Sequence, residues 1–468
     1  MYRTSVGASD AAGRLIAVTY GSGSSAGTYR GYDALGRVLR QYQQTDSVNY
    51  LVEATYYANG AIQNETYPSV PGFGDRRFVS YVNDAAGRLA SLTSNATSYS
   101  SGASVSGIGY SPHQAVTSET YGNSLIHAIN FNSRLQPSEI KLGTSGAPTS
   151  VIDLNYNYGT SNNNGNVMSL TYTGGGLSYS QTFSYDSLNR LATAQENGGS
   201  SWSQTNNYDI YGNRSIVGSG ITFNSNNRMN GYSYDSAGNL LNDGSHGYTY
   251  DGENKIAKVD GVAAYVYDGE GQRVRKLLGE NLRFVYGIGG QLMAEFNGVN
   301  GALSKEYIYS ASGLVATIEP GSNGTRYLTS DYLGSPRVVT NSSAVVISRH
   351  DFKPFGESLG SGIGGRTTGA GFGVADGLRE QFTSKERDNE TGLDYFASRY
   401  FASSQGRFTS ADSLVGSLMN PQTLNRYSYV GNNPTNFIDP TGHVRLDPPS
   451  KGDQGGYLRE NPYADAIA

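Results

Sequence analysis

The sequence predicts an all-β protein in which one short β-hairpin unit is repeated along most of the chain. Three observations lead to this prediction. Aliphatic residues are scarce while glycine and tyrosine are abundant, a Tyr-Asp turn motif recurs, and no helical pattern exceeds about three turns. The best helical patterns cover residues 377–381 and 410–418, where we expect short helices.

Composition favours thin sheets over a thick helical core. Of the 468 residues, 62 are glycine and 37 are tyrosine, against 15 phenylalanines and 1 tryptophan, and only 37% are hydrophobic. Tyrosine buries ring area while its hydroxyl stays near water or a backbone partner. Disorder is the alternative for a chain so rich in glycine, serine and asparagine, but the regular tyrosine spacing argues against it.

The repeated unit begins with Tyr-Asp and places glycine or asparagine three residues after the aspartate. Its copies are spaced by about 16 to 26 residues where they are consecutive. The copies have their aspartates at Asp10, Asp33, Asp84, Asp186, Asp209, Asp235, Asp251 and Asp268. The long gaps between some of them hold degenerate copies. The period indicates a repeat architecture in which neighbouring hairpins bury each other's apolar faces.

The chemistry of the unit predicts its conformation. Aspartate followed by glycine at the fourth position is favoured in a type I turn, where the carboxylate accepts backbone N–H groups. Gly, or Asn as at Asn189 and Asn254, tolerates the positive φ that closes a hairpin with a bulge. Alternating residues before the turn, as in Tyr265-Val266-Tyr267, predict half-buried strands.

Charge and cysteine content exclude several classes of protein. The net charge is −5 with no basic stripe, so nucleic acid is not an expected partner. The chain has no cysteine, and its five histidines lack metal-site spacing, so we expect no metal or other cofactor. Gly360 to Gly365 spells G-x-G-x-x-G without the strand and helix that a nucleotide site needs.

Targeting signals are absent from the sequence as written. There is no apolar stretch for a signal peptide near Met1, and no run of about 18 apolar residues for a membrane span. A repeat unit follows Met1 almost at once, which fits a fragment or a late start within a longer protein.

The Tyr-Asp-x-x-Gly-Arg unit resembles the YD repeat of Rhs (rearrangement hotspot) proteins. The end of the chain makes the resemblance specific, because five linked motifs occur there in the family's order. They are Asp331 to Thr340, Phe352 to Glu357, Lys385 to Tyr395, Arg399 to Asp412, and Asn425 to Gly442. The chain is identified as a member of this family, with YD repeats in residues 1–325, an Rhs repeat-associated core domain in 326–442, and a short flexible tail in 443–468.

The resemblance implies a β-hairpin ribbon that spirals into a shell, with the core domain curling inward as a plug. The repeats are too few for a closed shell, so we expect an open, partial one. The expected role is structural: a secreted or cell-surface scaffold of a polymorphic-toxin protein, whose partners are its own C-terminal cargo or other chains of a toxin assembly. A surface module that recognises glycans or a neighbouring cell is one alternative, because exposed tyrosine rings stack on sugars.

The other alternative is an aspartyl autoprotease that cuts its own chain after a D-P-x-G-L motif, as self-processing members of the family do. No multiple-turnover enzyme is expected. The matching positions are Asp388 and Asp412, with Arg387 beside the first. Such chemistry needs two carboxyl groups close enough to share a proton. The ordinary structural alternative makes Asp388 a turn acid paired with Arg387 or Lys385, and Asp412 the N-cap of a short helix.

The predicted cleavage region departs from the family's pattern. Asp439, Pro440 and Gly442 match, but His443 stands where self-cleaving members have leucine, and Val444 follows it. A cut would therefore fall near the bond between His443 and Val444. The tail beyond it is too short for an ordinary toxin domain.

Overall fold

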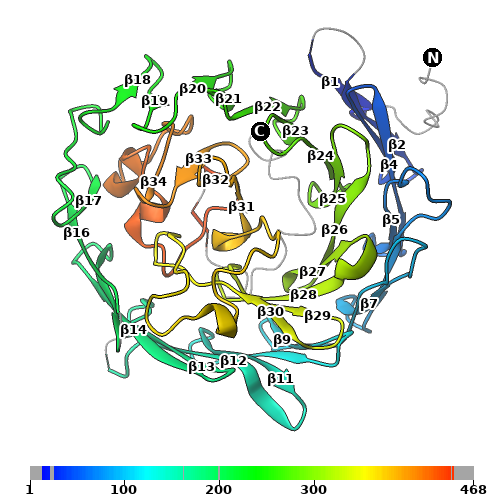
Figure 1. Ribbon diagram of the computed structural model, residues 1–468, viewed down its shortest axis with the longest axis horizontal. Helices are drawn as coiled ribbons and strands as arrows, with labels where there is room; N and C mark the ends of the chain where they lie inside the picture. Colours follow the sequence, from blue (N-terminus) through cyan, green and yellow to red (C-terminus); the bar gives the residue numbers. More distant parts are fainter. Residues whose placement is uncertain (1–12, 22–25, 162, 199–200, 444, 447–468) are drawn as a thin grey trace.

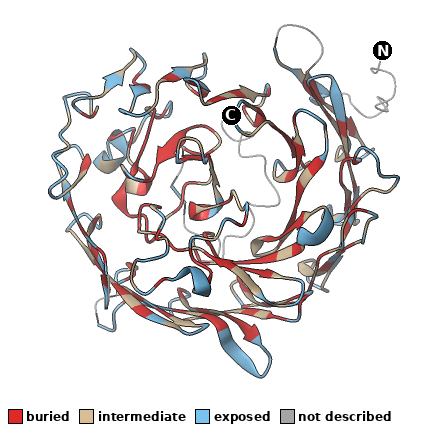
Figure 2. Ribbon diagram, in the orientation of Figure 1, coloured by how far each residue is buried: buried red, intermediate tan, exposed pale blue. Residues whose placement is uncertain are grey.

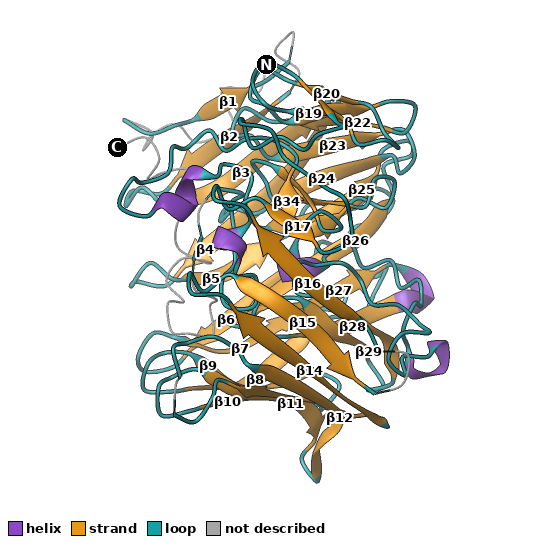
Figure 3. Cartoon of the chain, turned by 90° about the vertical axis from the view of Figure 1, so that its left-hand side faces the viewer, coloured by secondary structure: helices purple, strands orange, loops and turns teal. Residues whose placement is uncertain are grey.

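The computed structural model describes residues 13–21, 26–161, 163–198, 201–443 and 445–446. These residues form β-strands and loops almost throughout (Figures 1 and 3). The helices among them are short 3-10 turns: η2 (Gly321–Asn323), η3 (Thr368–Ala370), η4 (Phe382–Ser384), η5 (Pro421–Leu424) and η6 (Val430–Asn432). The predicted all-β class is confirmed. The expected helices at 377–381 and 410–418 are wrong, since both segments are irregular.

Seventeen strands form a first antiparallel sheet in which each strand pairs with the next along the chain. They are β1 (Ala17–Thr19), β2 (Gly27–Tyr32), β3 (Val38–Thr45), β4 (Val48–Tyr56), β5 (Ile62–Thr66), β6 (Phe78–Asn83), β7 (Leu89–Ser94), β8 (Ser104–Tyr110), β9 (Val116–Tyr121), β10 (Ile126–Phe131), β11 (Pro137–Thr144), β12 (Ala147–Asn157), β13 (Ser169–Gly174), β14 (Leu177–Tyr185), β15 (Leu191–Asn197), β16 (Ser203–Tyr208) and β17 (Arg214–Ile216).

A second sheet of eleven strands repeats this meander, after a two-stranded ribbon of β18 (Ser233–Tyr234) and β19 (Leu240–Asn242). Its strands are β20 (Tyr248–Tyr250), β21 (Ile256–Val259), β22 (Ala263–Tyr267), β23 (Arg273–Leu277), β24 (Leu282–Tyr286), β25 (Leu292–Asn297), β26 (Leu303–Ser310), β27 (Gly313–Glu319), β28 (Gly324–Ser330), β29 (Pro336–Asn341) and β30 (Val346–Arg349). A four-stranded sheet follows: β31 (Glu386–Arg387), β32 (Leu393–Tyr395), β33 (Tyr400–Ala402) and β34 (Arg407–Phe408).

The ribbon of strands winds as a spiral. Strands β1 to β17 form the outer turn, β24 to β30 lie inside it, and β31 to β34 lie nearer the centre (Figure 1). Side chains of the outer turn donate hydrogen bonds to backbone carbonyls of the inner turn: Gln43 to Phe284 at 2.6 Å and Tyr67 to Tyr307 at 2.6 Å. We call residues 350–443, which follow β30, the plug.

The repeated turn has the predicted conformation. The Oδ1 of Asp33 accepts the backbone N–H groups of Leu35 and Arg37, both at 2.9 Å, and its Oδ2 accepts the Nε–H of Arg37 at 2.7 Å. Gly36 has φ 85°, and the non-glycine residue at the same position, Asn189, has φ 59°. The predicted glycine or asparagine three residues after the aspartate is therefore confirmed, because φ at this position is positive in both turns.

Consecutive turns also stack on one another. The guanidinium of Arg37 lies 4.7 Å from the ring centroid of Tyr56 in the next unit, and the Tyr56 hydroxyl donates to the Val38 carbonyl at 2.6 Å. The same pair of contacts joins Arg88 to Tyr110, and again Arg190 to Tyr208. This explains why tyrosine and arginine recur at fixed places in the unit: each tyrosine ring covers the arginine of the preceding turn.

The main apolar core runs between the two turns of the spiral and continues into the plug (Figure 2). Phe296 of β25 packs on Tyr50 of β4 with ring centroids 4.8 Å apart. In the plug, the ring centroid of Phe401 lies 4.8 Å from that of Tyr429 and 5.5 Å from that of Phe408. The plug therefore has an aromatic cluster of its own inside the spiral.

The ribbon is not closed into a barrel. Among the described strands β1 pairs only with β2, β17 only with β16, and β20 only with β21. The predicted open, partial shell is thus confirmed. The domain boundary expected between residues 325 and 326 falls inside β28, and it stays a prediction about sequence units.

Candidate functional site

We call the eleven-stranded sheet β20 to β30 the inner sheet. Asp388 lies at the junction of the plug and this inner sheet, directly after β31. Its carboxylate is fully buried and accepts two hydrogen bonds from Arg273, at 2.7 and 2.9 Å, and one from Lys276 at 3.2 Å. Burial raises the pKa of Asp388, but Arg273 and Lys276 outweigh it and hold the pKa below its ordinary value. Asp388 is therefore an ionised acid held by two cations of the inner sheet, not by Arg387 or Lys385.

Arg387 points to the opposite side of β31, because successive side chains of a strand alternate. Its guanidinium binds Asp394 of β32 through two hydrogen bonds of 2.7 Å. It also donates to the Gly356 carbonyl at 2.8 Å and to Ser358 at 2.7 Å. Arg387 thus fixes the plug's own sheet and does not contact the carboxylate beside it in the sequence.

Asp412 lies against the predicted cleavage region. Its Oδ1 is 2.7 Å from Nδ1 of His443, and its Oδ2 is 2.9 Å from the guanidinium of Arg399. Burial raises the pKa of Asp412, while His443 and Arg399 outweigh it and lower the pKa. The Oδ1 also accepts the Leu414 N–H at 2.9 Å, as an N-cap would, although no helix follows.

The D-P-x-G segment forms a turn like those of the repeats. The Oδ1 of Asp439 accepts the backbone N–H groups of Gly442 at 2.8 Å and His443 at 3.0 Å. Lys385 donates to the Pro440 carbonyl at 2.5 Å, and Arg399 donates to the Gly442 carbonyl. The segment is therefore held by two cations, the half-buried Lys385 and the buried Arg399. Val444 lies outside the described residues.

The structure brings part of the predicted site together. Arg399 lies beside Asp412 and Asp439 and donates to the Gly442 carbonyl. Asp412 also contacts His443, and Asp439 accepts the Gly442 N–H. Asp388 and Asp412 have no partner in common among the described residues. A dyad of these two carboxylates therefore stays a prediction, and it requires one of them to leave its present ion pairs.

Sequence reasoning missed Arg273 and Arg399 as organising residues. The residue after the turn is aliphatic in most units, as at Leu89, Leu191 and Ile256, but it is arginine at Arg214 and Arg273. These exceptions were the available signal, because both arginines contact the plug. Arg399 belonged to a family motif, yet nothing in its spacing placed it beside Gly442.

The plug is also tied to the turns of the ribbon through amide and hydroxyl groups. Asn425 donates to Asn213 at 2.9 Å, and the Tyr427 hydroxyl donates to the Gly238 carbonyl at 2.8 Å. Asn433 and Asn436 both donate to Asn166, at 3.1 and 3.0 Å. In three units asparagine stands where other units have arginine: Asn213, Asn239 and Asn166. Asn213 and Asn166 bind the plug instead of a neighbouring ring.

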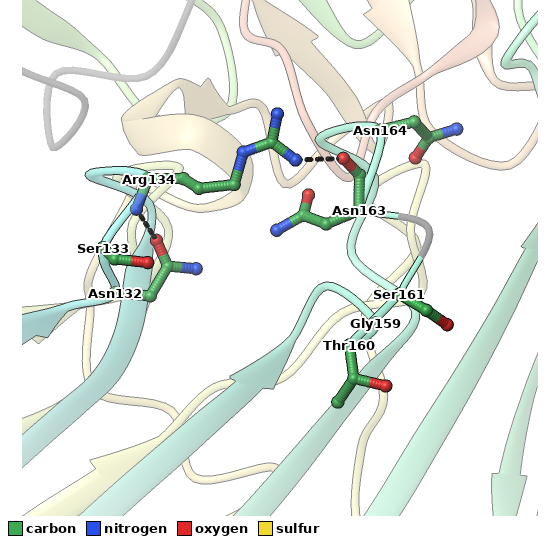
Figure 4. Close-up of a pocket in the computed structure, with 8 residues that line it drawn as sticks. All are labelled: Asn132, Ser133, Arg134, Gly159, Thr160, Ser161, Asn163 and Asn164. Atoms are coloured by element: carbon green, nitrogen blue, oxygen red, sulfur yellow. Dashed lines mark hydrogen bonds between the residues drawn. The ribbon is translucent and has the colours of Figure 1, made fainter.

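An exposed polar groove of about 630 Å³ lies at the edge of the outer turn (Figure 4). Its lining residues offer amides, hydroxyls and the guanidinium of Arg134, but no aromatic ring on which a sugar would stack. In the described part of the chain no group of three or more acidic or histidine side chains is arranged to hold a metal ion. Within that part, too, the helices are all too short or too polar to cross a membrane.

Comparison with known proteins identifies relatives over most of the chain. The family described as teneurin YD-shell matches residues 103–435, more than two thirds of the sequence. The tRNA3(Ser)-specific nuclease WapA of Bacillus spizizenii is 28% identical over 255 residues, which is 50% of this chain and 10% of that protein. The chain thus spans about a tenth of the length of such curated relatives.

Solved structures of toxin complexes share the fold. The Tc holotoxin pore of Photorhabdus luminescens superposes with a TM-score of 0.73 at 18% identity, covering 93% of this chain and 24% of that one. The TcdB2-TccC3 complex without its hypervariable C-terminal region gives a TM-score of 0.71 at 18% identity, covering 92% and 24%. The predicted YD-repeat ribbon is confirmed by these matches.

Proposed function

The chain belongs to the teneurin YD-shell family, and we propose that it is a structural scaffold whose ribbon surrounds whatever chain follows its plug. One observation carries this proposal. The plug lies inside the spiral (Figure 1), and Lys385 and Arg399 hold the Pro440 and Gly442 carbonyls there. A chain that continues beyond Gly442 therefore starts from within the ribbon.

The expected partners follow from the same proposal. They are the protein's own C-terminal cargo or further chains of a toxin-like assembly, since two matched structures are complexes of toxin components by name. The open edges at β1 and β17 leave room for more strands, because unpaired strand edges accept further strands by hydrogen bonding.

A reporter fusion tests the scaffold role. A small folded protein is fused after Ala468 in one variant and before Met1 in another, and both are digested with the same protease. We expect the C-terminal reporter to be cut more slowly than the N-terminal one, which should match the free reporter. Equal digestion rates would contradict the scaffold proposal.

Self-cleavage is the second candidate function, and the position of Asp412 favours it. Asp412 contacts His443, and Arg399 bridges Asp412 to the Gly442 carbonyl, so a carboxylate and a cation flank the region where a cut is expected. Amide hydrolysis requires a general base and a polarised scissile carbonyl, and Arg399 holds the Gly442 carbonyl, one peptide before the expected cut. Asp388 would have to exchange its partners Arg273 and Lys276 to join in.

Intact mass measurement tests this candidate on purified protein. Self-cleavage predicts loss of about 25 C-terminal residues from the wild type, through a cut near the bond between His443 and Val444. Asp412→Asn should abolish it, and Asp388→Asn should abolish it only if the predicted dyad assembles. A wild type that stays full length on long incubation would contradict self-cleavage and leave the scaffold role intact.

A further inference from the structure

Two glutamates of the plug, Glu380 and Glu386, form an unusual buried pair. They face each other across an isolated antiparallel bridge; Glu380 is buried, and the side chain of Glu386 is 9% exposed. Among the described residues, Oε2 of Glu380 and Oε1 of Glu386 have no hydrogen-bond partner. Like charges directly opposite each other on neighbouring strands are destabilising, and more so when buried.

The cations around this pair are already engaged. Arg273 binds Asp388 as well as Glu386, the latter at 2.7 Å. Lys305 donates to the Gly377 carbonyl at 2.5 Å and lies 3.6 Å from Glu319. Arg379, the remaining cation near Glu380, binds two other glutamates. Glu380 therefore has no ion pair of its own among the described residues.

The junction between plug and inner sheet holds more acids than bases. Seven carboxyl groups meet five cations there, a net charge of −2 if all were ionised. The acids are Glu280, Glu295, Glu319, Glu380, Glu386, Asp388 and Glu390, and the bases are Arg273, Lys276, Lys305, Arg326 and Arg379. This excess of negative charge is relieved most simply by protonating Glu380, which has no ion pair among the described residues, and Glu386, which shares its cation Arg273 with Asp388.

The electrostatic surroundings single out the same two groups. Burial raises the pKa of Glu380 to about 7, with Lys305 opposing the rise and Glu295 and Glu386 adding to it. The phenols of Tyr307 and Tyr309 also face Glu380 from β26. Burial likewise raises the pKa of Glu386, and Asp388 and Glu295 add to the rise, while Arg273 and Arg379 oppose it.

We propose that Glu380 and Glu386 form a proton-dependent latch that holds the plug against the inner sheet. With both groups protonated, the strand at β31 lies against β23 to β26 without unpaired charge. As they ionise, two neighbouring carboxylates repel each other in a buried site, and the contact between plug and sheet weakens.

The sign and size of the effect follow from the shifted pKa of Glu380. A carboxyl group whose pKa is raised by folding stabilises the folded state below its unfolded pKa, and this stability is lost as the pH rises through the folded value. With a folded pKa of about 7 and an unfolded one near 4.3, the folding equilibrium constant should fall about tenfold between pH 6 and pH 8.

Denaturant unfolding of the full chain between pH 5.5 and pH 8.5 tests the latch. Glu380→Gln keeps the shape of the protonated group and cannot ionise, so the fall in stability through pH 7 should be much smaller in this variant. Glu357→Gln is the matched control, because Glu357 lies on the same plug but its side chain is 40% exposed and pairs with Lys353. The control should keep the pH dependence of the wild type.

A second measurement guards against a variant that folds poorly. Limited proteolysis of the wild type at pH 6 and pH 8, with the cuts mapped by mass, should show new cleavage first around residues 377–402 at the higher pH. The latch is overturned if Glu380→Gln keeps the pH dependence of the wild type. It is also overturned if the first cuts at pH 8 fall in the outer sheet.

Discussion

The outer and inner turns of the ribbon are made from the same hairpin unit, yet they are buried differently. In β14 of the outer turn, buried residues alternate with partly exposed ones. In β24 and β25 of the inner turn, four consecutive residues are buried. The outer turn covers one face of these two strands and the plug covers the other, so β24 and β25 have no face left for solvent.

This difference explains the polar residues of the inner sheet. Along β25, Phe296 faces the outer turn and contacts Tyr50, while Glu295 faces the plug and binds Arg379 at 3.1 Å. A charge on the outer face of the ribbon meets water, whereas a charge on the inner sheet needs a partner. Both neighbours reach the inner sheet through ion pairs as well as rings: Arg77 of the outer turn binds Glu306 at 2.6 Å, and Arg379 of the plug binds Glu295.

Removing a charged side chain should give the largest difference in stability loss between the inner sheet and the outer turn. Arg273→Met leaves Asp388 and Glu386 buried without their shared cation, so we expect a loss of about 3–5 kcal/mol in the free energy of unfolding. Arg40→Met, on the outer turn, breaks a solvent-exposed pair with Glu53 and should cost about 1 kcal/mol or less. Urea unfolding measures both, and equal losses would contradict the comparison.

Truncating a phenylalanine should sharpen the same contrast. Phe296→Ala opens a cavity between the two turns, where the side chain is fully buried, and should cost about 3–5 kcal/mol. Phe78 on outer strand β6 is 43% exposed, so Phe78→Ala should cost about 1 kcal/mol or less. Thermal or urea unfolding of the two variants side by side decides the matter, and a larger loss at Phe78 would refute it.

Turn glycines should show a smaller version of the effect. Gly60 of the outer turn has φ 89°, and an added Cβ would meet no other atom within 4 Å. Gly60→Ala should therefore lower the free energy of unfolding by about 1–2 kcal/mol, the cost of placing a non-glycine residue in the left-handed region. Gly442 has φ 82°, and an added Cβ would lie 2.5 Å from the Phe396 carbonyl oxygen. Gly442→Ala should therefore cost more than Gly60→Ala in urea unfolding, and equal costs would show that the plug relaxes around the last turn.

Local features of the fold were predictable from the sequence because they depend on neighbouring residues. The turn at Asp186, the left-handed Asn189 and the alternating strands follow from residues less than ten positions apart. The pairing between turns was not predictable. Asp388 meets Arg273 across 115 residues, and any of the similar hairpins offered the same local pattern. Which distant hairpins pack on each other depends on the pitch of the spiral.

The candidate site likewise has a local part that was predictable and long-range contacts that were not. The turn formed by Asp439 and Gly442 is local and has the conformation typical of the unit. The neighbours of Asp388 and Asp412 come from strands and loops distant in the sequence, so their separate ion pairs could not be inferred from spacing. Arg399, which joins Asp412 to Gly442, became visible only in three dimensions.

Hydrogen exchange resolved along the chain tests the account most directly. If the plug and the outer turn both cover the inner sheet, amides of β24 to β29 should exchange slowest in the molecule, and amides of β3 to β5 should exchange faster. Equal protection of the two turns, or slower exchange in the outer one, would contradict a ribbon that winds inward around its own C-terminal plug.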